Sequence, residues 1–266
     1  MSAQPVCGPG VRAGYAGFGV PVRERSGETM TRTSRALLAV VAALLSLPGC
    51  GSAPAASPSP KLPPAASADR LYADYLAALR AARSEHYTGT VAFSDGTSVS
   101  LDVTATQTTA HLLARSQGIS VEEIVAGGRA FQRGGSHGPD WVVLPPEEAR
   151  GAVALTMERE AECAAREHGT LHLGPRTRIG GRLVATLVDD GRAAGAAPQS
   201  SYLTLDAPVR LVRVVQTGPQ SDGGSADCGH QPGPVAISAQ VDYDRFDTPV
   251  RITPPPNPTD PNAQTA

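Results

Sequence analysis

Several features that mark common classes of protein are scarce in this sequence. Aromatic residues make up 4% of the 266 residues, with a single Trp, so neither a base-stacking platform nor an aromatic sugar-binding surface is indicated. Lys61 is the only lysine, and the arginines are scattered rather than clustered. The formal net charge of −2 provides no electrostatic footprint for nucleic acid. A nucleic-acid partner is therefore set aside.

The chain also lacks an apolar run long enough to cross a bilayer. Residues 36–47 form an apolar stretch, but about 12 residues make a helix of about 18 Å, whereas a bilayer core of about 30 Å needs about 20 residues. Arg32 and Arg35 precede this stretch and small residues follow it, which is typical of an export signal. The sequence therefore predicts a cleaved signal peptide over residues 30–49.

The end of this signal indicates how the chain is processed. Leu47-Pro48-Gly49-Cys50 resembles a bacterial lipobox, whose cysteine is acylated and becomes the first residue of the mature protein. Pro48 departs from the usual pattern, and cleavage after Ala55 or Ala56 by an ordinary signal peptidase is the alternative. We expect Cys50 to carry the lipid and to hold the protein at the extracytoplasmic face of the cell membrane.

Composition divides the chain into five parts. Residues 50–68 are rich in Pro, Ser and Ala and cannot bury enough apolar surface to offset the entropy of ordering, so they predict an extended tether. A second Pro-rich tract closes the chain. The expected organisation is an upstream extension before a true start at Met30 (1–29), a lipoprotein signal peptide (30–49), the tether (50–68), one domain with a sizeable core (69–254) and a disordered tail (255–266).

Periodicity within the domain predicts a helix, a series of strands, a second helix and a second series of strands. Apolar residues recur at helical spacing from Leu71 to Leu79, with Asp69 as a candidate cap. Alternating segments flank Asp95-Gly96, which predicts a hairpin. A second helix is expected between Pro146 and His168. Further strands are predicted at residues 108–114, 120–126, 129–133, 141–144, 182–189, 201–206, 209–216 and 235–243.

Gly-Gly or Pro separates most of these strands, as in antiparallel neighbours joined by tight turns. An antiparallel sheet of this size must cover one of its faces, and two helices can do so if the sheet curls around them. The expected fold class is therefore α+β, with helices packed on one face of a curled antiparallel sheet.

Two cysteines remain in the expected mature domain, Cys163 and Cys228. In an exported protein, such a pair most often forms a disulfide. A metal site is the alternative, because His168 and His172 follow Cys163 and His230 follows Cys228, and sulfur and imidazole suit zinc or copper. Free thiols or redox chemistry are a third interpretation. We favour the disulfide and expect no metal and no cofactor.

No pattern in the domain predicts catalysis. Gly134 to Gly138 match G-x-S-x-G with Ser136 at the nucleophile position, but that motif requires a strand before the serine and a helix after it, and a strand is expected next. The acidic pairs Glu122-Glu123 and Asp189-Asp190 are expected to be solvated surface. His86 and His111 have no partner that the sequence reveals. We therefore expect no catalytic residue and no enzyme.

Several phrases resemble the LppX and LprG group of actinobacterial lipoproteins, which are relatives of the lipoprotein carrier LolA. The phrases are VEEIVAGGRAFQRG followed by WVVLP, then RIGGRLVATLVDDG, and finally VDYDRFDTPVRITPPP. Here the group's recurring positions would be Gly127, Gly128, Phe131, Trp141, Gly181, Tyr243, Phe246, Pro249 and Ile252. The resemblance spans residues 69–254. It implies a strongly curved antiparallel half-barrel with helices on its concave side and a cavity for acyl chains.

The resulting hypothesis is an anchored envelope lipoprotein that binds or relays a lipid, lipoglycan or other amphiphile in the half-barrel. The alternative is a non-enzymatic protein-interaction module, such as a sensor or assembly factor, on the same fold. A curled sheet whose apolar face exceeds what two short helices cover leaves an apolar pocket. The candidate wall residues of that pocket are Val99, Leu101, Val103, Leu203, Leu205, Ile237 and Val241.

Overall fold

The computed structural model describes residues 67–230 and 233–261 of the chain. The predicted extension (1–29), signal peptide (30–49), acylated Cys50 and all but the end of the tether lie outside these residues. The helices are α1 (Ala68–Ala81), α2 (Pro146–Val153) and α3 (Met157–Arg166), with short 3-10 turns η1 (Gly135–His137) and η2 (Ala226–Cys228). The strands are β1 (Ser84–Phe93), β2 (Ser98–Thr106), β3 (Ala110–Ser116), β4 (Ile119–Ala126), β5 (Arg129–Gly134), β6 (Val142–Val143), β7 (Leu171–Leu173), β8 (Thr177–Ile179), β9 (Arg182–Asp189), β10 (Gln199–Thr204), β11 (Leu211–Gln216) and β12 (Ala236–Phe246).

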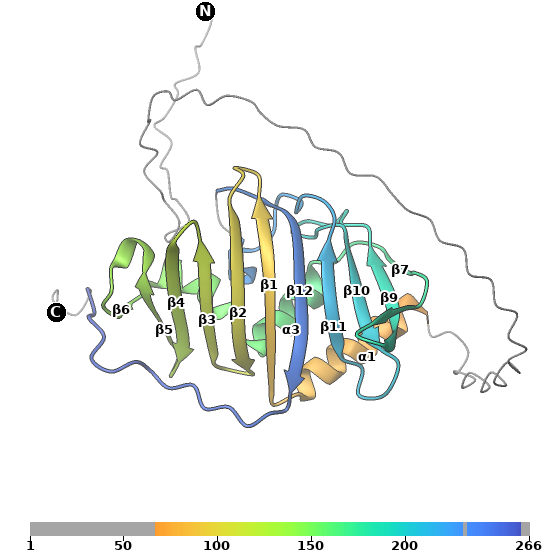
Figure 1. Cartoon of the computed structure of the whole chain (residues 1–266), viewed down its shortest axis with the longest axis horizontal. Helices are drawn as coiled ribbons and strands as arrows, with labels where there is room; N and C mark the ends of the chain where they lie inside the picture. The colour runs from red at the N-terminus through yellow and green to blue at the C-terminus, as the bar shows by residue number, and fades with distance from the viewer. Residues whose placement is uncertain (1–66, 231–232, 262–266) are drawn as a thin grey trace, which may run out of the picture. The chain divides into compact units, whose positions relative to one another are not determined.

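Within the described residues the strands form one twelve-stranded sheet in the order β6-β5-β4-β3-β2-β1-β12-β11-β10-β9-β7, with β8 also pairing with β9. Each strand pairs antiparallel with its neighbour. The sheet is curved and does not close (Figure 1). The last strand, β12, lies at the centre beside β1, and the two share a register from Glu85–Phe246 to Phe93–Ala236. The predicted class, an α+β half-barrel, is confirmed.

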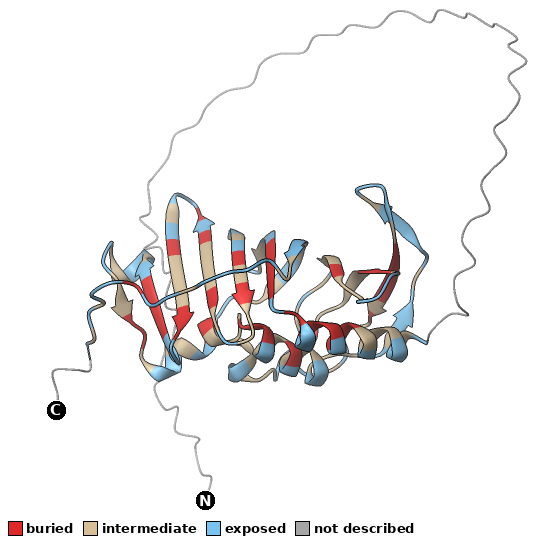
Figure 2. Cartoon of the chain, turned by 90° about the horizontal axis from the view of Figure 1, so that it is seen from below, coloured by how far each residue is buried: buried red, intermediate tan, exposed pale blue. Residues whose placement is uncertain are grey.

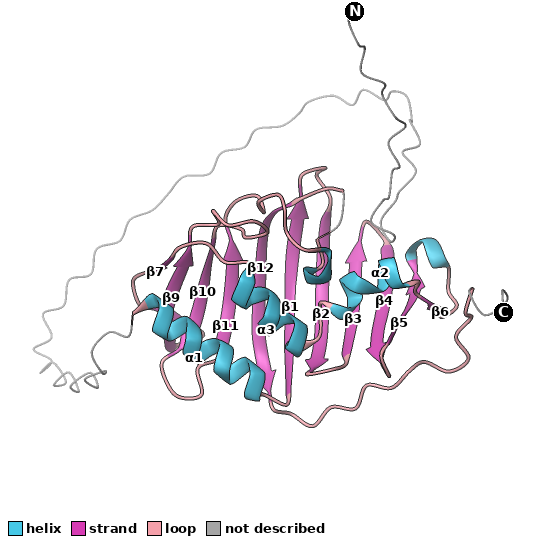
Figure 3. Ribbon diagram, turned by 180° about the vertical axis from the view of Figure 1, so that it is seen from behind, coloured by secondary structure: helices cyan, strands magenta, loops and turns pink. Residues whose placement is uncertain are grey.

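All three helices lie on the same face of the sheet (Figure 3), which we call the concave face. Figure 2 shows buried residues separated by more exposed ones along strands such as β2, because successive side chains of a strand point to opposite faces. A hydrophobic core joins helix residues such as Leu79, Ala152 and Met157 to strand residues such as Val125 and Leu203.

Helix α1 begins two residues before its expected start. The predicted cap, Asp69, lies in the first turn, and Ser67 is the cap instead, since its side chain accepts a hydrogen bond from the Arg70 backbone N at 3.2 Å. The acidic Asp69 is still favourable at the positive end of the helix dipole. The predicted apolar stripe is confirmed, because Tyr75, Leu76 and Leu79 are buried.

The single helix predicted between Pro146 and His168 is wrong, because the structure divides it into α2 and α3. The chain leaves helical geometry at Thr156 (ψ 143°), whose hydroxyl donates to the Val153 carbonyl at 2.9 Å. Met157, which follows, is completely buried. The break lets α2 pack against β4 and β5 while α3 reaches β2 and α1.

The hairpin predicted at Asp95-Gly96 joins β1 and β2. Gly96 takes a positive φ of 84°, and the Asp95 carboxylate accepts a hydrogen bond from the Thr97 backbone N at 2.9 Å. Strand β1 starts at Ser84, earlier than the sequence pattern indicates.

The end of the chain differs from the expected disordered tail at 255–266, of which residues up to 261 are described. Thr259 lies beside β6, where its backbone N donates to the Trp141 carbonyl at 2.8 Å and its carbonyl accepts from Val143 N at 2.9 Å. Pro255 is buried. The C-terminal segment therefore covers the outer edge of the sheet at β6.

Candidate functional site

The central strands present a continuous apolar strip on the concave face. In the register of β1 with β2, Val99 faces Val91, Leu101 faces Gly89 and Val103 faces Tyr87. On the other side of β1, Val241 of β12 faces Gly89. Gly89 leaves no space for a side chain, because an added Cβ would lie 2.5 Å from the Gln240 carbonyl oxygen. The strip is therefore built around a close approach of β1 and β12.

The structure places the seven predicted wall residues in different surroundings. Leu203 of β10 pairs with Ala185 and Leu211 and belongs to the core beneath the helices. Ile237 lies where the register of β12 shifts and is 40% exposed. Val99 and Val103 are buried, whereas Leu101, Leu205 and Val241 are only partly buried. The β2 residues and Val241 thus come together on the central strip, and the role of all seven as a wall stays a prediction.

Two acidic side chains lie under the helices, at the end of this strip where β1 begins. Glu85 of β1 shares the concave face with Tyr87 and is 2% exposed. It is hydrogen-bonded to Glu160 of α3, and Glu160 also accepts a long hydrogen bond of 3.5 Å from the Tyr75 hydroxyl. Within the described residues, Oε1 of Glu85 has no hydrogen-bond partner. The pair is therefore a polar group enclosed by the apolar core.

Burial sets the protonation of this pair. It raises the pKa of Glu85 well above the usual range, the charge of Glu160 raises it further, and Arg210 opposes the shift. Burial also raises the pKa of Glu160. A desolvated carboxylate beside another is costly, so these surroundings favour the protonated form of the pair. Burial and the two glutamates likewise raise the pKa of the adjacent Tyr87 and Tyr243.

This acidic pair was not predicted from the sequence. Its signal is the alternation of β1, in which Glu85 has the same parity as Tyr87, Gly89 and Val91. A charged residue at an apolar position of a strand indicates either an error in the assigned face or a buried acid. The sequence pattern indicated a strand only from residue 90 onward, so this conflict was not visible.

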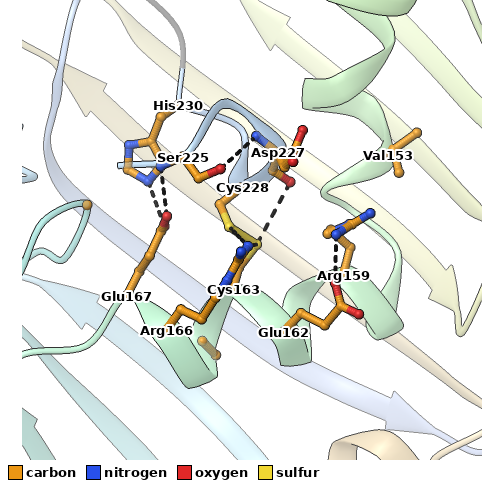
Figure 4. The surroundings of a disulfide bond; sticks show 12 residues. Val153, Arg159, Glu162, Cys163, Arg166, Glu167, Ser225, Asp227, Cys228 and His230 are labelled. Carbon is orange, nitrogen blue, oxygen red and sulfur yellow. Dashed lines mark hydrogen bonds and ion pairs between the residues drawn. A yellow bond between two sulfur atoms is a disulfide. The ribbon is translucent and has the colours of Figure 1, made fainter. Parts of the chain in front are cut away.

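A disulfide joins α3 to the segment between β11 and β12, as predicted. The Cys163 and Cys228 sulfur atoms are bonded, and the two cysteines are separated by 65 positions along the chain. Figure 4 shows that Glu167 and His230 face each other next to this bond, with His230 Nε2 2.9 Å from the Glu167 carboxylate. Glu167 also accepts from the Ser225 backbone N at 2.8 Å. The η2 segment is therefore fixed to the helices at two points.

The metal alternative at these residues loses its sulfur ligands, because both thiols are used in the disulfide. His168 instead contacts the Tyr72 ring edge-on at 5.0 Å between centroids, and His172 is exposed on β7. In residues 67–230 and 233–261, no group of three or more His, Cys, Asp or Glu side chains is placed to hold a metal ion.

The opposite face of the sheet is polar over β1, β2 and β12. His86, described above as having no visible partner, lies between two carboxylates: its Nε2 is 3.0 Å from Asp102, and its Nδ1 contacts Asp244. His111 is 2.8 Å from Glu122, which also pairs with Arg133. An open hollow of about 520 Å³ over β2, β1 and β12 is lined by Thr88, Thr90, Ser100, Gln240 and Asp242, together with Gly89 and Leu101. These polar side chains do not form an acyl-chain pocket.

Ser136 lies in η1, a 3-10 turn between β5 and β6, and is exposed. The strand-turn-helix arrangement that would make it a nucleophile is not present at this position. In the part of the chain that the structure describes, no helix combines the length and the apolar character needed to cross a bilayer.

The chain matches no family model and no curated protein. Among solved structures it is similar to the Mycobacterium tuberculosis lipoprotein LppX, with 18% identity and a TM-score of 0.44 over 68% of this chain and 97% of LppX. It is also similar to MucB (15%, TM-score 0.37, covering 71% of this chain and 62% of MucB). A third is a DUF1329 family protein from Desulfovibrio piger (9%, TM-score 0.28, covering 70% of this chain and 93% of that protein).

LppX is thus one of the solved structures that this chain resembles, as the sequence phrases predict. At these identities and scores, the likeness says nothing about ligand or activity.

Proposed function

We propose that this protein is an exported lipoprotein, anchored by Cys50 at the extracytoplasmic face of the membrane, that binds or relays a lipid or other amphiphile on its concave face without catalysing a reaction. The observation that carries the proposal is the apolar strip of the central strands. It continues beyond the core under the helices, and Leu101 and Val241 on it remain partly exposed. Apolar surface of this kind favours an acyl chain over water.

A matched pair of variants on one strand tests the concave face. Leu101 and its neighbour Ser100 lie on opposite faces of β2, and neither is fully buried. Leu101→Arg places a charge on the apolar strip and should abolish lipid loading, because an unpaired charge in apolar surroundings is costly. Ser100→Arg places the same charge on the polar face and should leave loading intact.

The measurement is a mass spectrum of the organic extract from each protein, purified without detergent from its natural host. Stoichiometric lipid with wild type and Ser100→Arg, and none with Leu101→Arg, is the expected result. A clean extract from folded wild-type protein would contradict the proposal and favour a protein-interaction module. Loss of membrane association in Cys50→Ser tests the anchor separately.

A further inference from the structure

A second polar cluster lies on the concave face, at the corner formed by β4, β5, η1 and α2. Glu123 of β4 was expected to be solvated surface, but that expectation is wrong. Its neighbour Glu122 points to the outer face, where it pairs with Arg133, whereas Glu123 shares the concave face with Val121 and Val125. Burial raises the pKa of Glu123 to about 7. Burial is the cause of this shift, and within residues 67–230 and 233–261 no ion pair offsets it.

Gln132 forms the floor of this corner. It lies directly across from Glu123 in the register of β4 with β5 and is 2% exposed. Among the residues that the structure describes, its side-chain Nε2 has no hydrogen-bond partner. A buried N–H without a partner costs free energy comparable to a lost hydrogen bond. The buried amide of Gln132, across from Glu123, is therefore an incomplete hydrogen-bonding site, and we call the space between α2 and these two residues the recess.

His137 and Glu148 complete the rim. His137 Nε2 and Glu148 Oε2 lie 3.5 Å apart, and both atoms are buried without a hydrogen bond to another described residue. The two groups form an ion pair, and their side chains are 25% and 32% exposed, so solvent reaches the cluster at this point. Its rim and its floor both have unused hydrogen-bonding capacity.

The packing of α2 on the sheet brings Glu148 and His137 close to Glu123 and Gln132. Ala152 of α2 packs in the core with Val125 and Ala130, and Glu148 lies one helical turn earlier on the same side of α2. Along β5 the chain runs from Ala130 through Gln132 to η1. Helix α2 therefore extends from the Val125–Ala130 pair to η1. The Glu123–Gln132 pair lies between these two points, so α2 passes over it.

The donors and acceptors of this recess suit hydroxyl groups. Gln132 and His137 present N–H donors, whereas Glu123 and Glu148 present acceptors, and a hydroxyl both donates and accepts. A phosphate is disfavoured because two carboxylates face it and the nearby Arg133 is engaged on the outer face. We propose that the recess under α2 binds the neutral, hydroxyl-bearing head group of the amphiphile, such as a glycerol ester. This inference rests on the proposed function and adds the head-group chemistry to it.

Two probes with the same acyl chain test the assignment: 1-monooleoylglycerol, which has two free hydroxyls, and methyl oleate, which has none. The full-length protein is incubated with phosphatidylcholine vesicles that contain one probe, and the probe bound to protein is measured after the vesicles are removed. The variants are Gln132→Leu, which removes the buried donor, and Glu148→Leu, which is partly exposed in a helix and is not expected to disturb folding. Comparing wild type with variant for each probe cancels the probe's own affinity for the vesicle.

We expect each variant to bind monooleoylglycerol about tenfold less than wild type, the value of one good hydrogen bond, and methyl oleate equally well. Equal losses for both probes, or no loss for either, would overturn the head-group assignment and leave the amphiphile function standing. If wild type takes up neither probe, the proposed function fails, and this inference fails with it. Because Glu148→Leu tests the same recess from the helix, misfolding of Gln132→Leu does not remove the test.

Discussion

At the scale of single residues, the unusual feature of this protein is the number of carboxyl groups on a face expected to be apolar. Glu85, Glu160 and Glu123 all have raised pKa values caused first by burial. Natural cores avoid unpaired charge because desolvation is costly. Protonation of these glutamates removes the charge, so this face becomes less polar as the pH falls.

The pair under the helices makes stability depend on pH with a definite sign. The pKa of Glu85 and Glu160 is higher in the folded than in the unfolded protein, so their contribution is fully present below the ordinary value of 4.5 and is lost as pH rises through the folded pKa. Glu160→Gln removes one carboxyl but keeps the shape and a hydrogen-bonding group. We expect this variant to be more stable than wild type by about 1–3 kcal/mol at pH 8, with little difference at pH 4.

Urea unfolding of both proteins at several pH values between 4 and 8 measures this effect. Tyr75, Arg210, Tyr87 and Tyr243 also face the pair and are the same in both proteins, so the difference reports Glu160. Glu162→Gln is the control, because Glu162 is an exposed residue of the same helix that pairs with Arg159. If Glu160→Gln is less stable than wild type at pH 8, the ionised carboxylate of Glu160 stabilises the fold, and the pair does not depend on protonation.

At the scale of elements, the disulfide links helix α3 to the long connection before β12. It closes a loop of 65 residues, for which the chain-entropy model gives about 4 kcal/mol. We expect Cys163→Ala/Cys228→Ala to lose about this much free energy of unfolding and to become insensitive to reductant. Wild type in reductant should lose a similar amount.

Hydrogen exchange shows which part of the domain loses stability when the disulfide is removed. Without the bond, η2 keeps its connection to α3 through Glu167, which binds both Ser225 and His230. We expect exchange to accelerate in residues 217–230 and to remain slow in α1, which the bond does not touch. Equal acceleration throughout the domain would indicate that the bond supports the whole fold rather than this segment.

The elements also show what a sequence reveals. The hairpin at Asp95-Gly96 and strand β2 were predicted because a turn dipeptide and the alternation of apolar and polar residues are local signals. The break at Thr156 was missed, since no Gly or Pro marks it and the cause is the tertiary burial of Met157. The Glu123–Gln132 recess was missed for the same reason: neighbouring glutamates look alike until the register of β4 assigns each to a face.

At the scale of the whole molecule, the open sheet exposes two edges, and the C-terminal segment covers one of them. Unpaired strand edges promote association between chains. The edge strand β6 is short, and Thr259 makes a parallel bridge to Val142 beside it. Arg129 at the start of β5 pairs with Asp260. The segment therefore acts as an additional strand position that terminates the sheet.

Removing this segment should turn the edge into a site of self-association. Deletion of residues 255–266 uncovers the backbone of Trp141 and Val143, which then lack the hydrogen bonds that Thr259 supplies. We expect a concentration-dependent shift to dimers or larger species in light scattering, together with a loss of about 1–3 kcal/mol for two backbone hydrogen bonds. Deletion of residues 262–266 alone keeps Thr259 and Asp260 and should remain like wild type. If the longer deletion stays monomeric at high concentration, the shortness of β6 protects the edge without the C-terminal segment.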